Sequence, residues 1–375
     1  MSEVDPKQVN GDVAPKQVNG DVAPAEPAKE VPADGPVVKE ISENNKDVNE
    51  NVEEKSGQDS KAKPDKKFLQ KPGVRLGPLL EKDIIPSQEE VKTYQDALAQ
   101  LKEVLSNQTA LKANRIFEYG SMESGTSVKN YWSVKLIVLT EGNVTALVDA
   151  LKGILKQKLG EHYNELSTSS DRVKFTWKLE EASFYGDIRL TTQPEANLTE
   201  ILTDKYSEEG AATFQRHLLT NEIQRLNFVK ERPEAVKKLI RLLTYLYINE
   251  VIEKPEGDSS EVSQGGSPDL DVLELVCVWA WGVAGSPETF NLKKGLTKVL
   301  DLIARPKDII IYWTTNYDPN TFLPHVECKM PFVMEAWNPY QNAAANFDWT
   351  SATKMAETAL NSRLMRSTPL EFDWQ

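Results

Sequence analysis

A glycine–serine turn placed ahead of a hydrophobic strand is the feature that most constrains the fold of this chain. The turn is Gly120-Ser121, and a Gly125-Thr126 pair follows it. About a dozen residues after the turn comes Ser133–Leu139, whose valines, leucines and isoleucine favour a β-strand. The segment Val128–Leu139 contains no aspartate or glutamate. Any chemistry that needs carboxylates on this strand is therefore excluded.

The turn and strand resemble those of the nucleotidyltransferase superfamily, which presents ATP phosphates to metal ions in this way. In active members the strand opens with Asp-x-Asp, both carboxylates hold Mg²⁺, and a third acid lies on a neighbouring strand. The first two positions read Ser133 and Lys135 here, and the third matches Asp187. A lysine ammonium cannot ligate a metal and repels it. We expect loss of catalysis and no metal site, with Asp187 as the surviving ligand if a metal binds at all.

An ordered set of residues in the second half of the chain resembles the second domain of the 2′-5′-oligoadenylate synthases. The resemblance covers roughly residues 75 to 365 and identifies a divergent member that lacks the Asp-x-Asp pair. It implies an α+β, bilobal nucleotidyltransferase fold, in which a mixed lobe with a β-sheet precedes a helical lobe. The matching positions are Arg232-Pro233, Lys237–Leu242, Leu273–Leu275, Val278–Trp281, Phe290-Asn291, Gly295, Val299-Leu300 and Ile311–Asp318.

Other positions that the resemblance places in the cleft have also changed. The family's cleft lysine corresponds to Thr244, and a glutamine that helps to hold the acceptor nucleotide corresponds to Leu270. The segment Glu335–Pro339 resembles an Asp-Pro-x-x-Pro segment lining the cleft, with the first acid kept in kind. For Gly120 and Ser121, nucleotide binding and a purely structural turn remain equally open.

The opposite charges of Lys135 and Asp187 suggest a structural role for this pair. We expect Lys135 to occupy the place of the metal and to form a salt bridge with Asp187. Mutation of Asp187 would then lower stability rather than activity.

The resemblance also implies an RNA-binding face, because basic residues opposite the cleft grip double-stranded RNA in this family. Arg115 and Lys230 match positions of that face, and Arg225 lies one residue from a third. Lysines and arginines along one face can read A-form RNA through its phosphates and 2′-hydroxyls. An ordinary solvated helix face is an equally good explanation of these residues.

Composition separates an N-terminal segment from the rest of the chain. Residues 1–68 are polar and contain a tandem nine-residue repeat beginning at Pro6 and Pro15. Such a segment cannot bury enough apolar surface to offset backbone ordering, so we expect a disordered low-complexity tail. An α+β lobe over 69–210, a helical lobe over 211–365 and a C-terminal tail over 366–375 should follow. Ser87 with Glu90 predicts a capped helix within the first lobe.

The net charge of −13 argues against a general nucleic-acid binder, although a local basic stripe is still permitted. Two cysteines, Cys277 and Cys328, indicate a reducing compartment. No signal peptide and no apolar stretch of membrane-span length is visible. We expect a protein of the cytoplasm or nucleus, with neither membrane nor DNA as a partner.

Three functions are open at this stage. The first is an inactive oligoadenylate-synthase-like protein that binds double-stranded RNA or a protein partner in antiviral innate immunity and needs no cofactor. The second is an active 2′-5′-oligoadenylate synthase, which would require ATP and Mg²⁺. The third is a dimerising scaffold similar in logic to the inactive nucleotidyltransferase-fold proteins of the DZF group.

Overall fold

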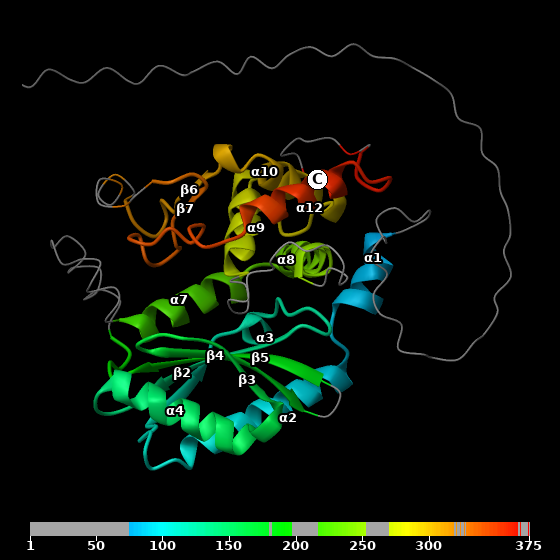
Figure 1. Ribbon diagram of the computed structural model, residues 1–375. Coiled ribbons are helices and arrows are strands. Elements are labelled where there is room, and N and C mark those ends of the chain that lie inside the picture. Colours follow the sequence, from blue (N-terminus) through cyan, green and yellow to red (C-terminus); the bar gives the residue numbers. More distant parts are fainter. Residues whose placement is uncertain are drawn as a thin grey trace, which may run out of the picture. The chain divides into compact units, whose positions relative to one another are not determined.

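The computed structural model of the chain describes residues 75–179, 182–196, 217–252, 270–318, 320, 323, 326, 328–366, 368 and 374. These residues belong to one compact unit of the chain. The tail expected over 1–68 lies outside them. A sheet lobe is followed along the chain by a helical lobe (Figure 1), which confirms the predicted α+β, bilobal class.

A five-stranded sheet forms the first lobe, with the strand order β1-β2-β5-β4-β3. β2 and β5 pair in parallel, and the other neighbours are antiparallel. This pairing puts β2, the strand after the glycine–serine turn, inside the sheet between β1 and the central strand β5. The strands are β1 (Arg115–Glu118), β2 (Trp132–Leu139), β3 (Tyr163–Thr168), β4 (Arg172–Leu179) and β5 (Ala182–Thr191).

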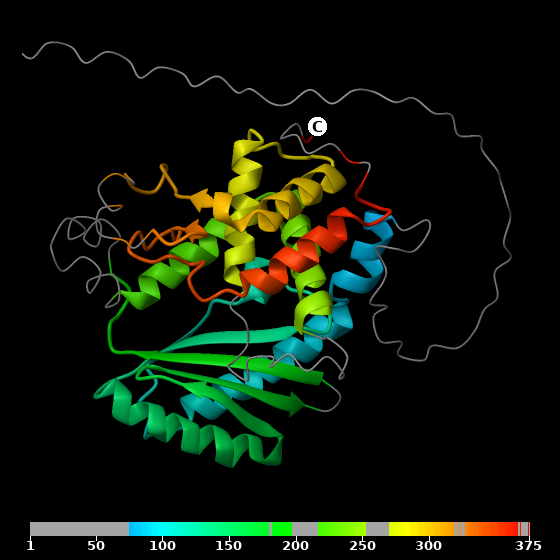
Figure 2. The same ribbon diagram turned by 45° about the horizontal axis from the view of Figure 1, so that its top comes forward.

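Two long helices cover one face of the sheet, as Figure 2 also shows. They are α2 (Gln88–Ser106) and α4 (Val144–Leu159). The predicted capping box of α2 is present, because Glu90 N–H donates to Ser87 Oγ at 3.3 Å and Ser87 N–H donates to Glu90 Oε2 at 2.8 Å. On α4, Asn143 Oδ1 accepts a hydrogen bond from Ala146 N–H at 3.1 Å.

Side-chain alternation along β2 separates the core from the cleft. Val134, Leu136 and Val138 are buried in the core that includes residues of α2 and α4. Ser133 and Lys135 alternate with them, so they lie on the opposite face. A short helix α3 (Ser121–Ser124) follows the glycine–serine turn, and a 3₁₀ turn (Gly160–His162) precedes β3.

The first turns of the described chain pack on the second lobe rather than on the sheet. α1 (Leu76–Leu79) and a π-helical turn (Leu80–Ile84) place Leu79, Leu80 and Ile84 in the core of the helical lobe. Trp374, in the segment that the sequence analysis leaves as a tail, is also buried in that core. Both ends of the described chain thus stabilise the same lobe.

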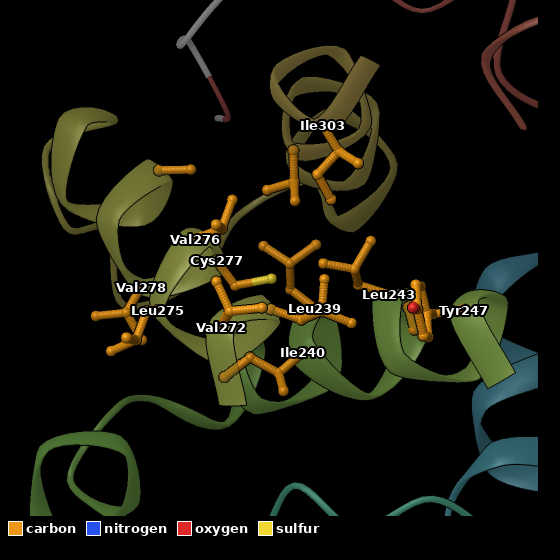
Figure 3. Close-up of a cluster of buried hydrophobic side chains, with 14 of the residues drawn as sticks. Leu239, Ile240, Leu243, Tyr247, Val272, Leu275, Val276, Cys277, Val278 and Ile303 are labelled. Atoms are coloured by element: carbon orange, nitrogen blue, oxygen red, sulfur yellow. The ribbon is translucent and has the colours of Figure 1, made fainter. Parts of the chain in front are cut away.

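Burial of apolar side chains holds the helical lobe together. Figure 3 shows Leu239, Ile240 and Leu243 packed against Val272 and Val276. None of the described helices is both long enough and apolar enough to cross a bilayer. The elements are α7 (Leu218–Lys230), α8 (Glu234–Tyr247), a π-helical turn (Ile248–Ile252), α9 (Asp271–Val283), α10 (Leu292–Ala304), a 3₁₀ turn (Pro306–Asp308), β6 (Ile310–Ile311), β7 (Phe332–Val333) and α12 (Trp349–Leu360).

A substitution at Gly186, on β5, tests the packing of the sheet. A Cβ on Gly186 would lie 2.3 Å from Cζ of Phe175, which is fully buried and packs against Trp177 at a ring distance of 5.4 Å. We expect Gly186→Ala to lower the unfolding free energy in urea by about 2 to 3 kcal/mol, because overpacking forces the ring to move.

Gly153→Ala in α4 is the matched control for this substitution. Its added methyl would meet no atom within 4 Å. It should raise stability by up to about 1 kcal/mol, because alanine favours a helix more than glycine does. Equal effects of the two substitutions would contradict this account of the packing.

Candidate functional site

The three positions matched to the family's metal-binding acids lie together on one face of the sheet. The parallel pairing of β2 and β5 sets Ser133 opposite Tyr185 and Lys135 opposite Asp187. Paired residues of adjacent strands point to the same face. Ile137, on that face as well, packs in a cluster with Leu219 of α7. The candidate site therefore lies between the sheet and the helical lobe.

The glycine–serine turn lies directly beside this face. Tyr119 N–H donates to the carbonyl oxygen of Lys135 at 3.1 Å. A Cβ on Gly120 would lie 3.2 Å from the carbonyl oxygen of Ser133, and Gly125 ends α3 with a φ of 78°. Both glycines are thus accounted for by close approach and backbone conformation, without a ligand.

Lys135 and Asp187 each have a partner other than the one expected. Lys135 Nζ donates to Asp271 Oδ1 at 2.8 Å and to Oδ2 at 2.7 Å. Asp187 is held by Arg172, whose Nε lies 2.6 Å from Oδ1 and whose Nη2 bonds Oδ2. The predicted salt bridge between Lys135 and Asp187 is therefore wrong: Lys135 pairs with Asp271, and Asp187 pairs with Arg172. A guanidinium matches a carboxylate in a two-point bond, whereas Lys135 reaches across to the helical lobe.

The side chains at this face do not fit Mg²⁺. The ion prefers hard oxygen ligands and usually takes carboxylates together with phosphates. Here Ser133 offers only a hydroxyl, Lys135 brings a positive charge, and both Asp187 oxygens are bonded to Arg172. Among the residues that the structure describes, no cluster of three or more His, Cys, Asp or Glu side chains could hold a metal ion.

Arg225 of α7 is the hub of a larger ion network in the cleft. Its guanidinium lies 2.6 Å from Asp271, 2.9 Å from Glu335, 3.4 Å from Glu222 and 3.9 Å from Glu274. The side chain is only 14% exposed. Arg225 therefore faces the cleft, and the expectation that it contributes to an RNA-binding face is not supported by its position.

Burial among other acids disturbs two of these carboxyl groups. Burial raises the pKa of Glu335 to about 7, and Glu222 and Asp271 add to the rise while Arg225 opposes it. Burial, followed by the charge of Asp271, likewise raises the pKa of Glu274, whose carboxylate accepts a hydrogen bond from the Thr126 hydroxyl at 2.6 Å. The network thus contains more carboxylates than positively charged side chains, and this excess of negative charge disfavours ionisation of its buried acids.

The positions predicted to line the cleft do converge. Ser121, Ser133, Lys135, Thr244 and Leu270 border a single pocket of about 40 Å³. Sites for small molecules usually have volumes of about 300 to 1,000 Å³. The pocket that Ser121 borders is therefore much smaller than an ordinary small-molecule site.

A wider cavity of about 430 Å³ lies on the other side of Lys135 and Asp271. Arg172, Arg189 and Arg225 line it together with carboxylates. Arg189 itself pairs with Glu222 at 3.2 Å and with Asp171 at 3.5 Å. The wall of this cavity is polar, but its positive charges are already paired.

The other two residues predicted to bind RNA lie at the surface. Arg115 is exposed on β1, and its guanidinium lies 4.3 Å from the ring centre of Phe117. Lys230, at the end of α7, pairs with Glu123 at 2.6 Å while remaining half exposed. Arg115 and Lys230 thus stay available to a partner, whereas Arg225 does not.

Two residues essential to this arrangement, Asp271 and Arg172, were not singled out from the sequence. Asp271 directly follows Leu270, which was singled out, and an acid there together with a lysine on β2 is a signal that could have found the pair. Nothing in the sequence pattern marks Arg172 as the partner of Asp187, because a bond between neighbouring strands depends on their register.

The coupling between Lys135 and Asp271 can be measured with a double-mutant cycle. We expect Lys135→Met and Asp271→Asn each to lower the unfolding free energy, and the pair to show a coupling of about 1 to 3 kcal/mol, because both charges are largely buried. The exposed pair Lys92 and Asp96 is the control, and its two substitutions should add with no measurable coupling. Additive effects at Lys135 and Asp271 would contradict the ion pair.

Comparison with known proteins finds sequence matches to the 2′-5′-oligoadenylate synthases. The family model of 2′-5′-oligoadenylate synthetase 1, domain 2, C-terminus, matches residues 192–373. 2′-5′-oligoadenylate synthase 3 of Mus musculus is 28% identical over 179 residues, 46% of this chain and 14% of that protein. The oligoadenylate synthase-like protein 1 of Mus musculus is 31% identical over 150 residues, 37% of this chain and 27% of that one.

A longer match is to 2′-5′-oligoadenylate synthase 1A of Rattus norvegicus, 26% identical over 285 residues, 66% of this chain and 76% of that protein. A solved structure of the Cid1 poly(U) polymerase has a TM-score of 0.49 at 14% identity, over 77% of this chain and 93% of that one. The chain spans well under a third of the synthase 3 and synthase-like relatives named above. By its sequence matches, the chain is similar to the 2′-5′-oligoadenylate synthases, and residues 192–373 match the C-terminal domain of that family.

Proposed function

We propose that this protein does not synthesise oligoadenylates and acts instead by binding a partner. One observation carries the proposal: the ammonium group of Lys135, at a position of a metal-binding acid, is bonded to Asp271 of the helical lobe at 2.7 Å. A positive charge fixed at this point repels Mg²⁺. A two-metal mechanism needs carboxylates that bring both ions to the phosphates, and these are replaced here.

The remaining cleft supports the same conclusion. The pocket that Ser121, Ser133 and Lys135 border has a volume of about 40 Å³, far below that of an ordinary small-molecule site. Thr244 and Leu270 offer no charge to a triphosphate. The apolar core of both lobes is nevertheless complete, so the fold serves as a scaffold whose outer surfaces remain available to a partner.

The resemblance to the synthases suggests either double-stranded RNA or a protein as the partner, in antiviral innate immunity. For RNA, the support is the exposure of Arg115 and Lys230. Two cations, one of them paired with Glu123, would give weak binding that falls steeply with salt. The net charge of −13 disfavours RNA elsewhere on the surface and suits a protein partner with a basic face.

Synthesis is tested by incubating the purified chain with ATP, Mg²⁺ and long duplex RNA, beside an active synthase as the positive control. We expect no 2′-5′-linked product above background, because no carboxylate pair holds the metals. The same result should follow when Mn²⁺ replaces Mg²⁺. Product formed in proportion to the amount of this chain, and abolished by Asp187→Asn, would overturn the proposal.

RNA binding is tested by gel shift with duplex RNA at low and moderate salt. If RNA is the partner, Arg115→Glu and Lys230→Glu should each weaken binding several-fold, because each reverses one phosphate contact. Lys158→Glu is the control, since this exposed residue lies on α4, across the sheet from α7 (Figure 1). Equal binding by all four proteins would remove RNA from the proposal and leave a protein partner.

A further inference from the structure

The wider cavity of about 430 Å³, between the sheet and the helical lobe, has no part in the proposed function. Its volume lies within the range of about 300 to 1,000 Å³ that is usual for small-molecule sites. Tyr119 and Arg189 border it from the sheet lobe, and Trp337 borders it from the helical lobe. Gly120 and Ser121 do not border it, so it is distinct from the small pocket that Ser121 borders.

Three of the side chains that border this cavity carry a buried polar atom with no hydrogen-bond partner among the described residues. These atoms are the hydroxyl oxygen of Tyr119, Nε of Arg189 and Nε1 of Trp337. Both nitrogens can only donate. Burial, followed by the charges of Asp187 and Glu222, raises the pKa of Tyr119, so its hydroxyl keeps the proton and donates as well. Because buried donors in native proteins are nearly always paired, the cavity favours a ligand that brings hydrogen-bond acceptors.

The charges around the cavity disfavour an ionic ligand. Among the described residues that border it, four side chains are basic and four are acidic, and Asp187, which is bonded to Arg172, adds a fifth carboxylate. An anion would add to this excess of negative charge. An ammonium or guanidinium group would bring only donors, which cannot pair with the three unpaired donors. A neutral molecule with several oxygen atoms meets both conditions.

The volume of the cavity limits the size of this molecule. At about 30 Å³ for each water, 430 Å³ gives room for about 14 water-sized groups. A hexose or a cyclic polyol, with about a dozen non-hydrogen atoms, is of this size. Each of its hydroxyl groups can accept from the three unpaired donors and can donate to carboxylates of the wall such as Asp171. The indole ring of Trp337 adds an aromatic surface for its C–H groups.

We propose that this cavity binds a neutral polyhydroxylated molecule of monosaccharide size, whose oxygen atoms accept hydrogen bonds from Tyr119, Arg189 and Trp337. The resemblance to the synthases assigns no ligand to these three side chains. Trp337 stands at one of the variable positions of the segment that resembles Asp-Pro-x-x-Pro. The site requires neither metal-binding acids nor an RNA-binding face, so it goes beyond the proposed function.

Isothermal titration calorimetry of the full chain tests the site with D-glucose, D-galactose, D-mannose and myo-inositol as probes at millimolar concentrations. At least one probe should bind, and glucose 6-phosphate should bind no more tightly than glucose, because its phosphate adds negative charge. Tyr119→Phe and Trp337→Phe each remove one donor and keep an aromatic ring. Each should weaken binding of the same probe about two- to tenfold, the effect of losing one neutral hydrogen bond.

Tyr163→Phe is the matched control for Tyr119→Phe. The Tyr163 hydroxyl is also buried with no partner among the described residues, but this residue does not border the cavity, and its ring lies 5.4 Å from that of Phe175. The variant should bind the probe as the wild type does.

Three results would count against the site. Equal binding by Tyr119→Phe, Trp337→Phe and Tyr163→Phe would overturn the assignment to this cavity. Tighter binding of glucose 6-phosphate than of glucose would overturn the neutral class of ligand. No binding of any of the neutral probes, as expected if only ordered water fills the cavity, would overturn the proposal itself. No ATP, metal ion or RNA takes part, so these outcomes are independent of the proposed absence of synthase activity.

Discussion

The ion pair between Lys135 and Asp271 is the interaction on which the rest of the candidate site depends. A cation on an inner strand of the sheet must be neutralised where little water reaches it, and Asp271 of α9 in the other lobe supplies the carboxylate. That carboxylate is shared with Arg225, which gathers Glu222 and Glu335 in turn. Lys135, at a position that matches a metal-binding acid, thus forms a salt-bridged contact between the lobes.

The fold accommodates a serine and a lysine on β2 because one face of this strand packs in the core while the other faces the cleft. Val134, Leu136 and Val138 lie in the buried core that β2 shares with the helices covering the sheet. Ser133 and Lys135 lie between them on the cleft face, where side chains can change without disturbing that core. The packing residues of β2 are therefore independent of the side chains on its cleft face.

Much of the fold could be predicted from the sequence, because local signals carried it. The spacing of Ser87 and Glu90 predicted the capping box, and the valines, leucines and isoleucine of Ser133–Leu139 predicted the strand after the glycine–serine turn. The ion-pair partners of the charged residues in the cleft could not be predicted from the sequence. Lys135 was assigned to Asp187 across the strand pair, but Asp187 binds Arg172, and Arg225 turns into the cleft. Which acid pairs with which base depends on strand register, helix rotation and the relative position of the lobes, and no local sequence pattern determines these.

A crystal structure of the chain grown with ATP and Mn²⁺, with the anomalous scattering of manganese recorded, tests the central claim most directly. The account predicts no manganese peak beside Asp187 and a Lys135 ammonium still bonded to Asp271. One or two manganese ions within bonding distance of Asp187, with Lys135 displaced and ATP phosphates at the glycine–serine turn, would contradict it.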